Sequence, residues 1–212
     1  MNINSTSSAV KLITAMALSL LLSGCAHNTG ISETPLPKAD AVELELFMGR
    51  WYVIANIPTF LEKTAHNATE DYAMNEDGSI ATTFSFNDGS FDGKRKTYTP
   101  TGYVSQQNNS LWGMQFIWPF KAEYVIAYVS DDYKHTIIAR SARDYLWIMS
   151  RQPQISDSEY QQLVLRCEAM GYDISKIQKV PQHWPDNSQR HSTGRLMQYV
   201  LNNKSQLGSK EF

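Results

Sequence analysis

Apolar and polar residues alternate along most of the chain between residues 50 and 151, and short polar runs interrupt the alternation at fairly even intervals. A period of two is typical of strands with one buried face. The pattern predicts strands over 51–57, 67–75, 79–86, 94–105, 111–118, 123–130, 135–141 and 144–151. Short turns join them, and Asp77-Gly78 is a strong hairpin signal. The sequence therefore predicts an all-β fold, an eight-stranded antiparallel up-and-down barrel without free edges.

One helix is predicted after the last strand. Ser156 and Glu159 have the spacing of a capping box, and Gly171 provides the stop. The apolar residues of this segment fall on one helical face: Tyr160, Leu163, Val164, Cys167 and Met170. We expect that face to pack against the outside of the barrel. A helical turn within 40–48 and a short closing strand over 174–180 complete the prediction.

The first residues have the character of a targeting signal. Lys11 precedes the apolar run Leu12 to Leu22, which is about half of the ~20 residues that a membrane-spanning helix needs. The sequence Leu22-Ser23-Gly24-Cys25 resembles the lipobox of bacterial lipoproteins. That resemblance implies cleavage before Cys25 and acylation of its thiol, and two or three acyl chains give a stable anchor. An ordinary signal peptide with a chance cysteine is the alternative.

These features divide the chain into four segments. We expect a lipoprotein signal peptide over 1–24, a lipidated tether over 25–39, a folded domain over 40–184 and a polar tail over 185–212. Ala26 stands where an aspartate would resemble an inner-membrane retention signal, so the resemblance favours the periplasmic face of the outer membrane. With Cys25 acylated, Cys167 has no partner for an intrachain disulfide.

Composition narrows the function classes. Apolar residues make up 42% of the 212 residues, and the net charge is −2, which argues against a nucleic-acid partner. The five histidines show no metal-ligand spacing, and no nucleophile motif is present. We therefore expect no metal, no cofactor and no catalytic residues.

Three motifs in order connect the chain to a known family. They are Gly49-Arg50-Trp51-Tyr52, the turn Ser130-Asp131-Asp132-Tyr133, and Arg143 to Arg151 on the last strand before the helix. With these motifs the chain resembles the lipocalins over about residues 40–184, most closely the bacterial ones. The resemblance implies that Gly49, Trp51 and Arg151 form a structural plug at the closed end of the barrel, with Arg151 across the Trp51 ring. Ser130 departs from the family, which usually has an aspartate there, and Asp131 is the expected substitute.

Strand parity, combined with the family pattern, predicts which side chains line the interior. The predicted ligand-binding residues are Phe84, Trp112, Met114, Phe116, Tyr124, Ile126, Tyr128, Ile138, Trp147 and Glu70. The alternative is that the aromatic residues simply fill the barrel as core. For Glu70 we favour a place in water at the open mouth, because a lone buried carboxylate is costly. A ligand head group or an inward tyrosine hydroxyl is its alternative partner.

The resemblance implies binding and transport or storage of small lipophilic ligands, fatty acids or lysophospholipids, in envelope maintenance or stress. The implied partners are that ligand and the membrane. The sequence leaves undecided whether the protein forms a homodimer. The alternatives are an envelope interaction module with a filled barrel and, less favoured, an enzyme acting on a lipophilic substrate.

Overall fold

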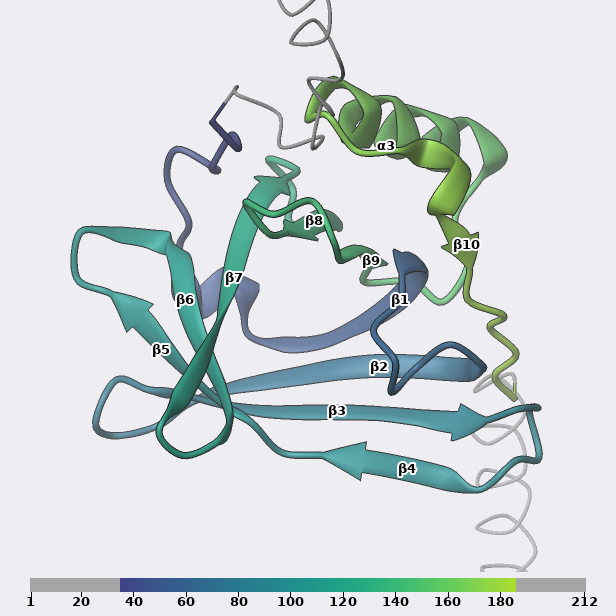
Figure 1. Cartoon of the computed structure of the whole chain (residues 1–212), viewed down its shortest axis with the longest axis horizontal. Coiled ribbons are helices and arrows are strands. Elements are labelled where there is room, and N and C mark those ends of the chain that lie inside the picture. The colour runs from purple at the N-terminus through teal and green to yellow at the C-terminus, as the bar shows by residue number, and fades with distance from the viewer. Residues whose placement is uncertain (1–34, 186–212) are drawn as a thin grey trace, which may run out of the picture. The chain divides into compact units, whose positions relative to one another are not determined.

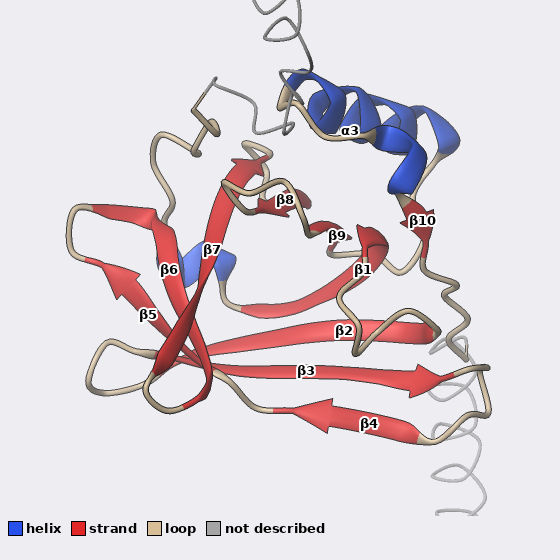
Figure 2. Ribbon diagram, in the orientation of Figure 1, coloured by secondary structure: helices blue, strands red, loops and turns tan. Residues whose placement is uncertain are grey.

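The computed structural model describes residues 35–185. Its strands are β1 (Gly49–Ile57), β2 (Ala65–Met74), β3 (Ile80–Asp88), β4 (Arg95–Tyr98), β5 (Thr101–Ser105), β6 (Asn108–Ile117), β7 (Phe120–Val129), β8 (His135–Ala139), β9 (Leu146–Ser150) and β10 (Gln178–Lys179). The helices are α2 (Leu44–Phe47) and α3 (Asp157–Ala169), followed by the 3-10 turn η1 (Ile174–Lys176) (Figure 2). The predicted signal peptide, the anchor Cys25, most of the tether 25–39 and nearly all of the tail 185–212 lie outside the described residues.

The strands form a closed antiparallel sheet. Neighbours in sequence pair with one another, and β1 returns to pair with β9 (Figure 1). β4 and β5 both pair with β3, one after the other, so together they take the place of one strand. The predicted eight-stranded barrel is confirmed, except that the predicted strand 94–105 is interrupted. The interruption falls at Thr99-Pro100, because proline has no N–H to give to a ladder.

Helix α3 covers one side of the barrel from outside. Ser156 and Glu159 form the predicted capping box, each side chain accepting from the other residue's backbone N–H. Leu163 and Cys167 are buried in an outer cluster with Ile137 and other outward residues of the strands, so the predicted placement of the helix is confirmed. The predicted closing strand 174–180 is shorter, since η1 takes its first half.

The closed end of the barrel has the expected plug. The Arg151 guanidinium carbon lies 3.8 Å from the centre of the Trp51 ring, and its nitrogens donate to the carbonyls of Arg50, Leu46 and Phe47 at 2.7–3.0 Å. Gly49 has φ +88°, a conformation that favours glycine. At the neighbouring turn, Ser130 itself, and not the expected Asp131, replaces the aspartate that the family usually has at this position. The Ser130 Oγ accepts hydrogen bonds from the backbone N–H groups of residues 134 and 135.

The wall between β1 and β2 is completed by a later part of the chain. β1 pairs with β2 only over Gly49–Tyr52, and β10 pairs with the far half of β1. Just beyond β10, Gln182 Nε2 donates to the backbone carbonyls of Val53 and Ala68, at 2.8 and 3.0 Å, and so bridges the two strands. We call residues 178–184 the C-terminal strap, because they close this seam.

Candidate functional site

The barrel interior is the candidate site, and mostly aromatic and aliphatic side chains wall it. Six predicted lining residues belong to the inner cluster and a seventh, Trp147, packs against it, so all seven have the predicted inward orientation; the six are Phe84, Trp112, Met114, Tyr124, Ile126 and Ile138. The cluster also holds Ile80, Phe86 and Met149, which parity turns inward. These side chains come from five strands, β3 and β6 to β9, and the alternation of each strand places them on one face.

The inward prediction is wrong for Tyr128. The β7–β8 register shifts between Ile126 and Tyr128, and a bulge of this kind turns the following side chains to the opposite face. Tyr128 therefore packs with the outer cluster, and the guanidinium carbon of Arg166 on α3 lies 4.1 Å from the centre of its ring.

Phe116 is also misplaced by parity. It is 51% exposed, and it lies in the stretch where the β6–β7 register shifts between Met114 and Ile117. The interior lining of β6 therefore ends at Met114, and Phe116 lies in the exposed last part of the strand.

Glu70 is buried, so its favoured place in water at the mouth is wrong. Its side chain is 7% exposed, and it accepts a hydrogen bond from the hydroxyl of Tyr72, which in turn contacts the hydroxyl of Tyr124. Burial raises the pKa of Glu70 to about 7, and the Tyr72 hydrogen bond only partly opposes this. Burial and the carboxylate also raise the pKa values of both tyrosines well above 10. Of the alternative partners predicted for Glu70, the structure therefore has the inward tyrosine hydroxyl.

Glu62 is a second buried carboxyl group, and the sequence reasoning missed it. It lies in the β1–β2 connection and is only 1% exposed. It accepts from the backbone N–H and the hydroxyl of Thr59, at 3.1 and 3.0 Å, and from Trp147 Nε1 at 3.1 Å. Burial raises its pKa, while these hydrogen bonds lower it. Strand parity does not apply to a connection, so no pattern marked this residue.

An aromatic group lies toward the closed end of the interior. Trp112 and Tyr124 stack with ring centres 5.4 Å apart, and Tyr72 meets Trp112 edge-on at 5.7 Å. Phe47 contacts both Tyr72 and Trp112, at 5.6 Å in each case. The Tyr72 hydroxyl therefore links this aromatic group to the Glu70 carboxyl group.

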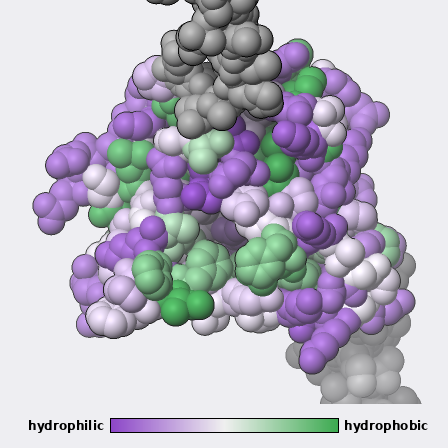
Figure 3. Space-filling model, in the orientation of Figure 1, coloured by the Kyte–Doolittle hydropathy of each residue, from purple (hydrophilic) through white to green (hydrophobic). Residues whose placement is uncertain are grey.

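The β6–β7 turn is unusually apolar and exposed. Ile117, Trp118 and Phe120 are 74%, 82% and 76% exposed. Phe60 in the β1–β2 connection, at the same end of the barrel strands, is 79% exposed. In Figure 3, apolar side chains gather below the middle of the face, where Figure 1 has the β6–β7 turn, and a hollow lies above them. We call these four residues the apolar rim. An exposed apolar group of this kind marks an interaction surface.

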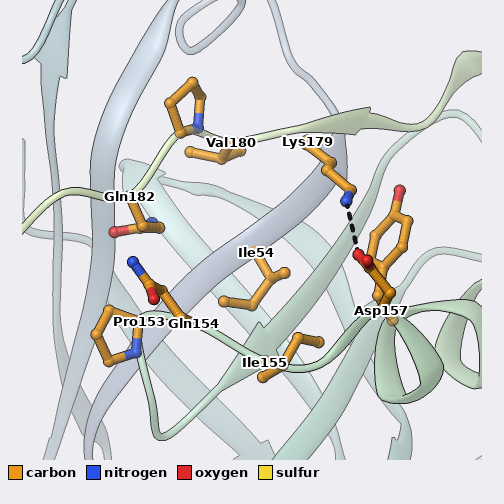
Figure 4. Close-up of a pocket in the computed structure, with 10 residues that line it drawn as sticks. Ile54, Pro153, Gln154, Ile155, Asp157, Lys179, Val180 and Gln182 are labelled. Carbon is orange, nitrogen blue, oxygen red and sulfur yellow. Dashed lines mark ion pairs between the residues drawn. The ribbon is translucent and has the colours of Figure 1, made fainter.

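A separate pocket of about 300 Å³ lies outside the barrel, between β1, the segment before α3 and the C-terminal strap (Figure 4). Ile54 and Ile155 form its apolar side, and the ion pair of Lys179 with Asp157, at 3.6 Å, lies at its edge. Both ion-pair partners are well exposed, so this pocket is open to water and distinct from the interior. In the part of the chain that the structure describes, no helix has the length and apolarity to cross a membrane.

Comparisons with known proteins agree with this architecture. A family model, the lipocalin-like domain, matches residues 42–182. Temperature-induced lipocalin-1 of Arabidopsis thaliana is 34% identical over 151 residues, covering 66% of this chain and 80% of its own. The outer membrane lipoprotein Blc of Citrobacter freundii is 26% identical over 170 residues, covering 78% and 93%.

Solved structures show the same fold at low identity. Insecticyanin from the tobacco hornworm Manduca sexta has a TM-score of 0.56 at 16% identity, covering 74% of this chain and 88% of its own. Apocrustacyanin C1 has a TM-score of 0.55 at 14% identity, covering 76% and 99%. The family model spans the barrel from the residues before β1 to the strap, and the chain belongs to the lipocalin family.

Proposed function

We propose that the chain binds small lipophilic ligands in the barrel interior, and stores or transports them at the bacterial outer membrane without catalysis. The main observation that supports this proposal is the barrel interior, which has a closed wall of apolar and aromatic side chains and a plug at one end. Sites for apolar ligands have such linings with a few polar groups among them. The proposed ligands are fatty acids or lysophospholipids.

The location rests on the N-terminal sequence and on the relatives. Leu22-Ser23-Gly24-Cys25 has the lipobox order, and relatives named outer membrane lipoprotein Blc match most of this chain. We propose that the segment 1–24 is removed and that acylated Cys25 holds the barrel at the periplasmic face. Replacing Cys25 by serine should release the protein from the membrane fraction, and a Cys25→Ser protein that stays there would refute the anchor.

The apolar rim supports exchange of ligands with a lipid surface. Trp118 and its neighbours resemble the aromatic residues that sit at membrane–water interfaces, and they lie on the β6–β7 turn at the end of the barrel opposite the plug. A mouth with this rim, held near lipids by a tether, would shorten the path between membrane and interior.

Native mass spectrometry with lipid extraction tests the binding proposal. The protein is the full chain with Cys25→Ser, so that no acyl chain of its own enters the interior. A co-purified or added lipid at unit stoichiometry is the expected result. Thr82→Trp, which fills the interior, should abolish it, whereas Thr83→Trp on the outward side of the same strand should not. A folded wild-type barrel that takes up neither fatty acid nor lysolipid would favour the interaction-module alternative.

A further inference from the structure

The barrel interior holds two carboxyl groups and no basic partner for them. Glu62 enters from the β1–β2 connection and Glu70 from β2, and each is less than a tenth exposed. Among the described residues, no lysine, arginine or histidine is buried to this degree. The two groups also interact electrostatically, because the negative charge of Glu62 contributes to the raised pKa of Glu70. Once they ionise, two acids in one apolar interior leave negative charge without compensation.

Two buried polar side chains of the interior make no hydrogen bond of ordinary geometry, one beside Glu62 and one opposite Tyr72, the partner of Glu70. Asn56 is fully buried on β1, opposite Trp147, and neither its amide nitrogen nor its amide oxygen makes a hydrogen bond of ordinary geometry. It nevertheless lies close enough to Glu62 to lower the pKa of that carboxyl group. Thr82 lies opposite Tyr72 in the β2–β3 register, and its buried hydroxyl has no partner. Buried polar atoms are almost always hydrogen-bonded in native proteins. We therefore infer that these atoms can hydrogen-bond a polar group of a ligand in the interior.

The surrounding rings suit a positive charge rather than a negative one. Trp112 and Tyr124 stack with ring centres 5.4 Å apart, Tyr72 meets both rings edge-on, and the Tyr72 hydroxyl connects this group to Glu70. Aromatic faces attract organic cations, above all ammonium groups. A carboxylate head group would instead bring a third negative charge into the interior.

We propose that the interior selects amphiphiles whose polar head is cationic, an amine or a quaternary ammonium group, with Glu70 as the direct contact and Glu62 as the second charge. This inference rests on the proposed function, and it narrows the ligand class. A lysolipid with an ammonium head fits it, and an ionised fatty acid does not. The preference should strengthen as pH rises through neutrality, since the groups that face Glu70 are Tyr72, Tyr124 and Glu62, with Asp71 beside it in sequence, and none of them is basic.

The test compares three ligands with the same tail: dodecyltrimethylammonium, dodecanoate and dodecanol, each below its micelle concentration. Titration calorimetry on the full chain with Cys25→Ser gives the three affinities at pH 6 and pH 8. At pH 8 we expect the ammonium ligand to bind about tenfold or more tightly than dodecanoate, the size of one desolvated contact of a quaternary ammonium group with a carboxylate or an aromatic ring. The ammonium head is charged at both pH values, so a rise in its affinity from pH 6 to pH 8 reports the protein's carboxyl groups.

Matched variants locate the effect. Glu70→Gln should remove most of the preference and its pH dependence, and Glu62→Gln should reduce it. Glu76→Gln, an exposed carboxylate on the β2–β3 turn, changes the net charge equally and should leave the preference unchanged. Tight binding of all three ligands without a head-group preference in the wild type would overturn the inference and leave the proposed function standing. Binding of none of them would overturn the proposed function.

Discussion

The buried carboxyl group of Glu70 makes the stability of the barrel depend on pH in an unusual direction. Its pKa is raised from 4.5 to about 7 in the folded protein, so the folded state holds this proton more tightly than the unfolded chain does. The stabilisation is complete below the unfolded pKa and is lost as pH rises through the folded one. Most carboxyl groups in proteins act in the opposite direction.

The size of the effect follows from the two pKa values. At about 1.4 kcal/mol for each pKa unit, the difference between 4.5 and about 7 corresponds to about 3 kcal/mol in total, of which about 2.5 kcal/mol falls between pH 5 and pH 8. Small domains have unfolding free energies of about 5–15 kcal/mol, so the loss is a measurable fraction of the whole.

This loss of stability is measured by urea denaturation of the wild type and of Glu70→Gln at several pH values from 5 to 8. Other titrating groups contribute to both proteins, so the informative quantity is the difference between their unfolding free energies. We expect the wild type to lose about 2–3 kcal/mol relative to the variant over this range. Parallel curves for the two proteins would refute a buried Glu70 with a raised pKa.

Three further substitutions test other parts of the structure. Arg151→Met removes the cation from the Trp51 ring and four hydrogen bonds to carbonyls, and it should lower the unfolding free energy in urea by about 2 kcal/mol. Ser156→Ala breaks the capping box and should cost about 1 kcal/mol in thermal unfolding, whereas Ser158→Ala in the same helix should cost less. Trp118→Ser should weaken co-sedimentation with lipid vesicles and leave ligand affinity in solution unchanged, because the side chain is exposed on the rim; equal sedimentation of both proteins would argue against rim contact.

The strands and the helix could be predicted because their signals are local. Alternation marked each strand, and the spacing of Ser156 and Glu159 marked the start of the helix. The interruption at Pro100 also had a visible signal, since proline cannot donate within a ladder. The inward orientation of Ile126 and Ile138 followed from parity, which holds wherever a strand is regular.

The errors arose where parity stops applying. The bulge beside Tyr128 depends on how β7 fits β8, and no residue there signals it in advance. Glu62 lies in a connection whose path is set by contacts with Thr59 and the distant Trp147. Glu70 was placed in water on the grounds of cost, whereas a tyrosine hydroxyl and a raised pKa reduce that cost.

The C-terminal strap also bears on the order in which the protein folds. Its Gln182 reaches carbonyl groups 129 and 114 positions earlier in the chain, and contacts this distant in sequence form slowly. During synthesis or export, nearly the whole barrel emerges before the segment that seals the seam between β1 and β2. Until then the apolar interior stands open along one side, where aggregation is a hazard and where a lipid could enter sideways rather than through the mouth.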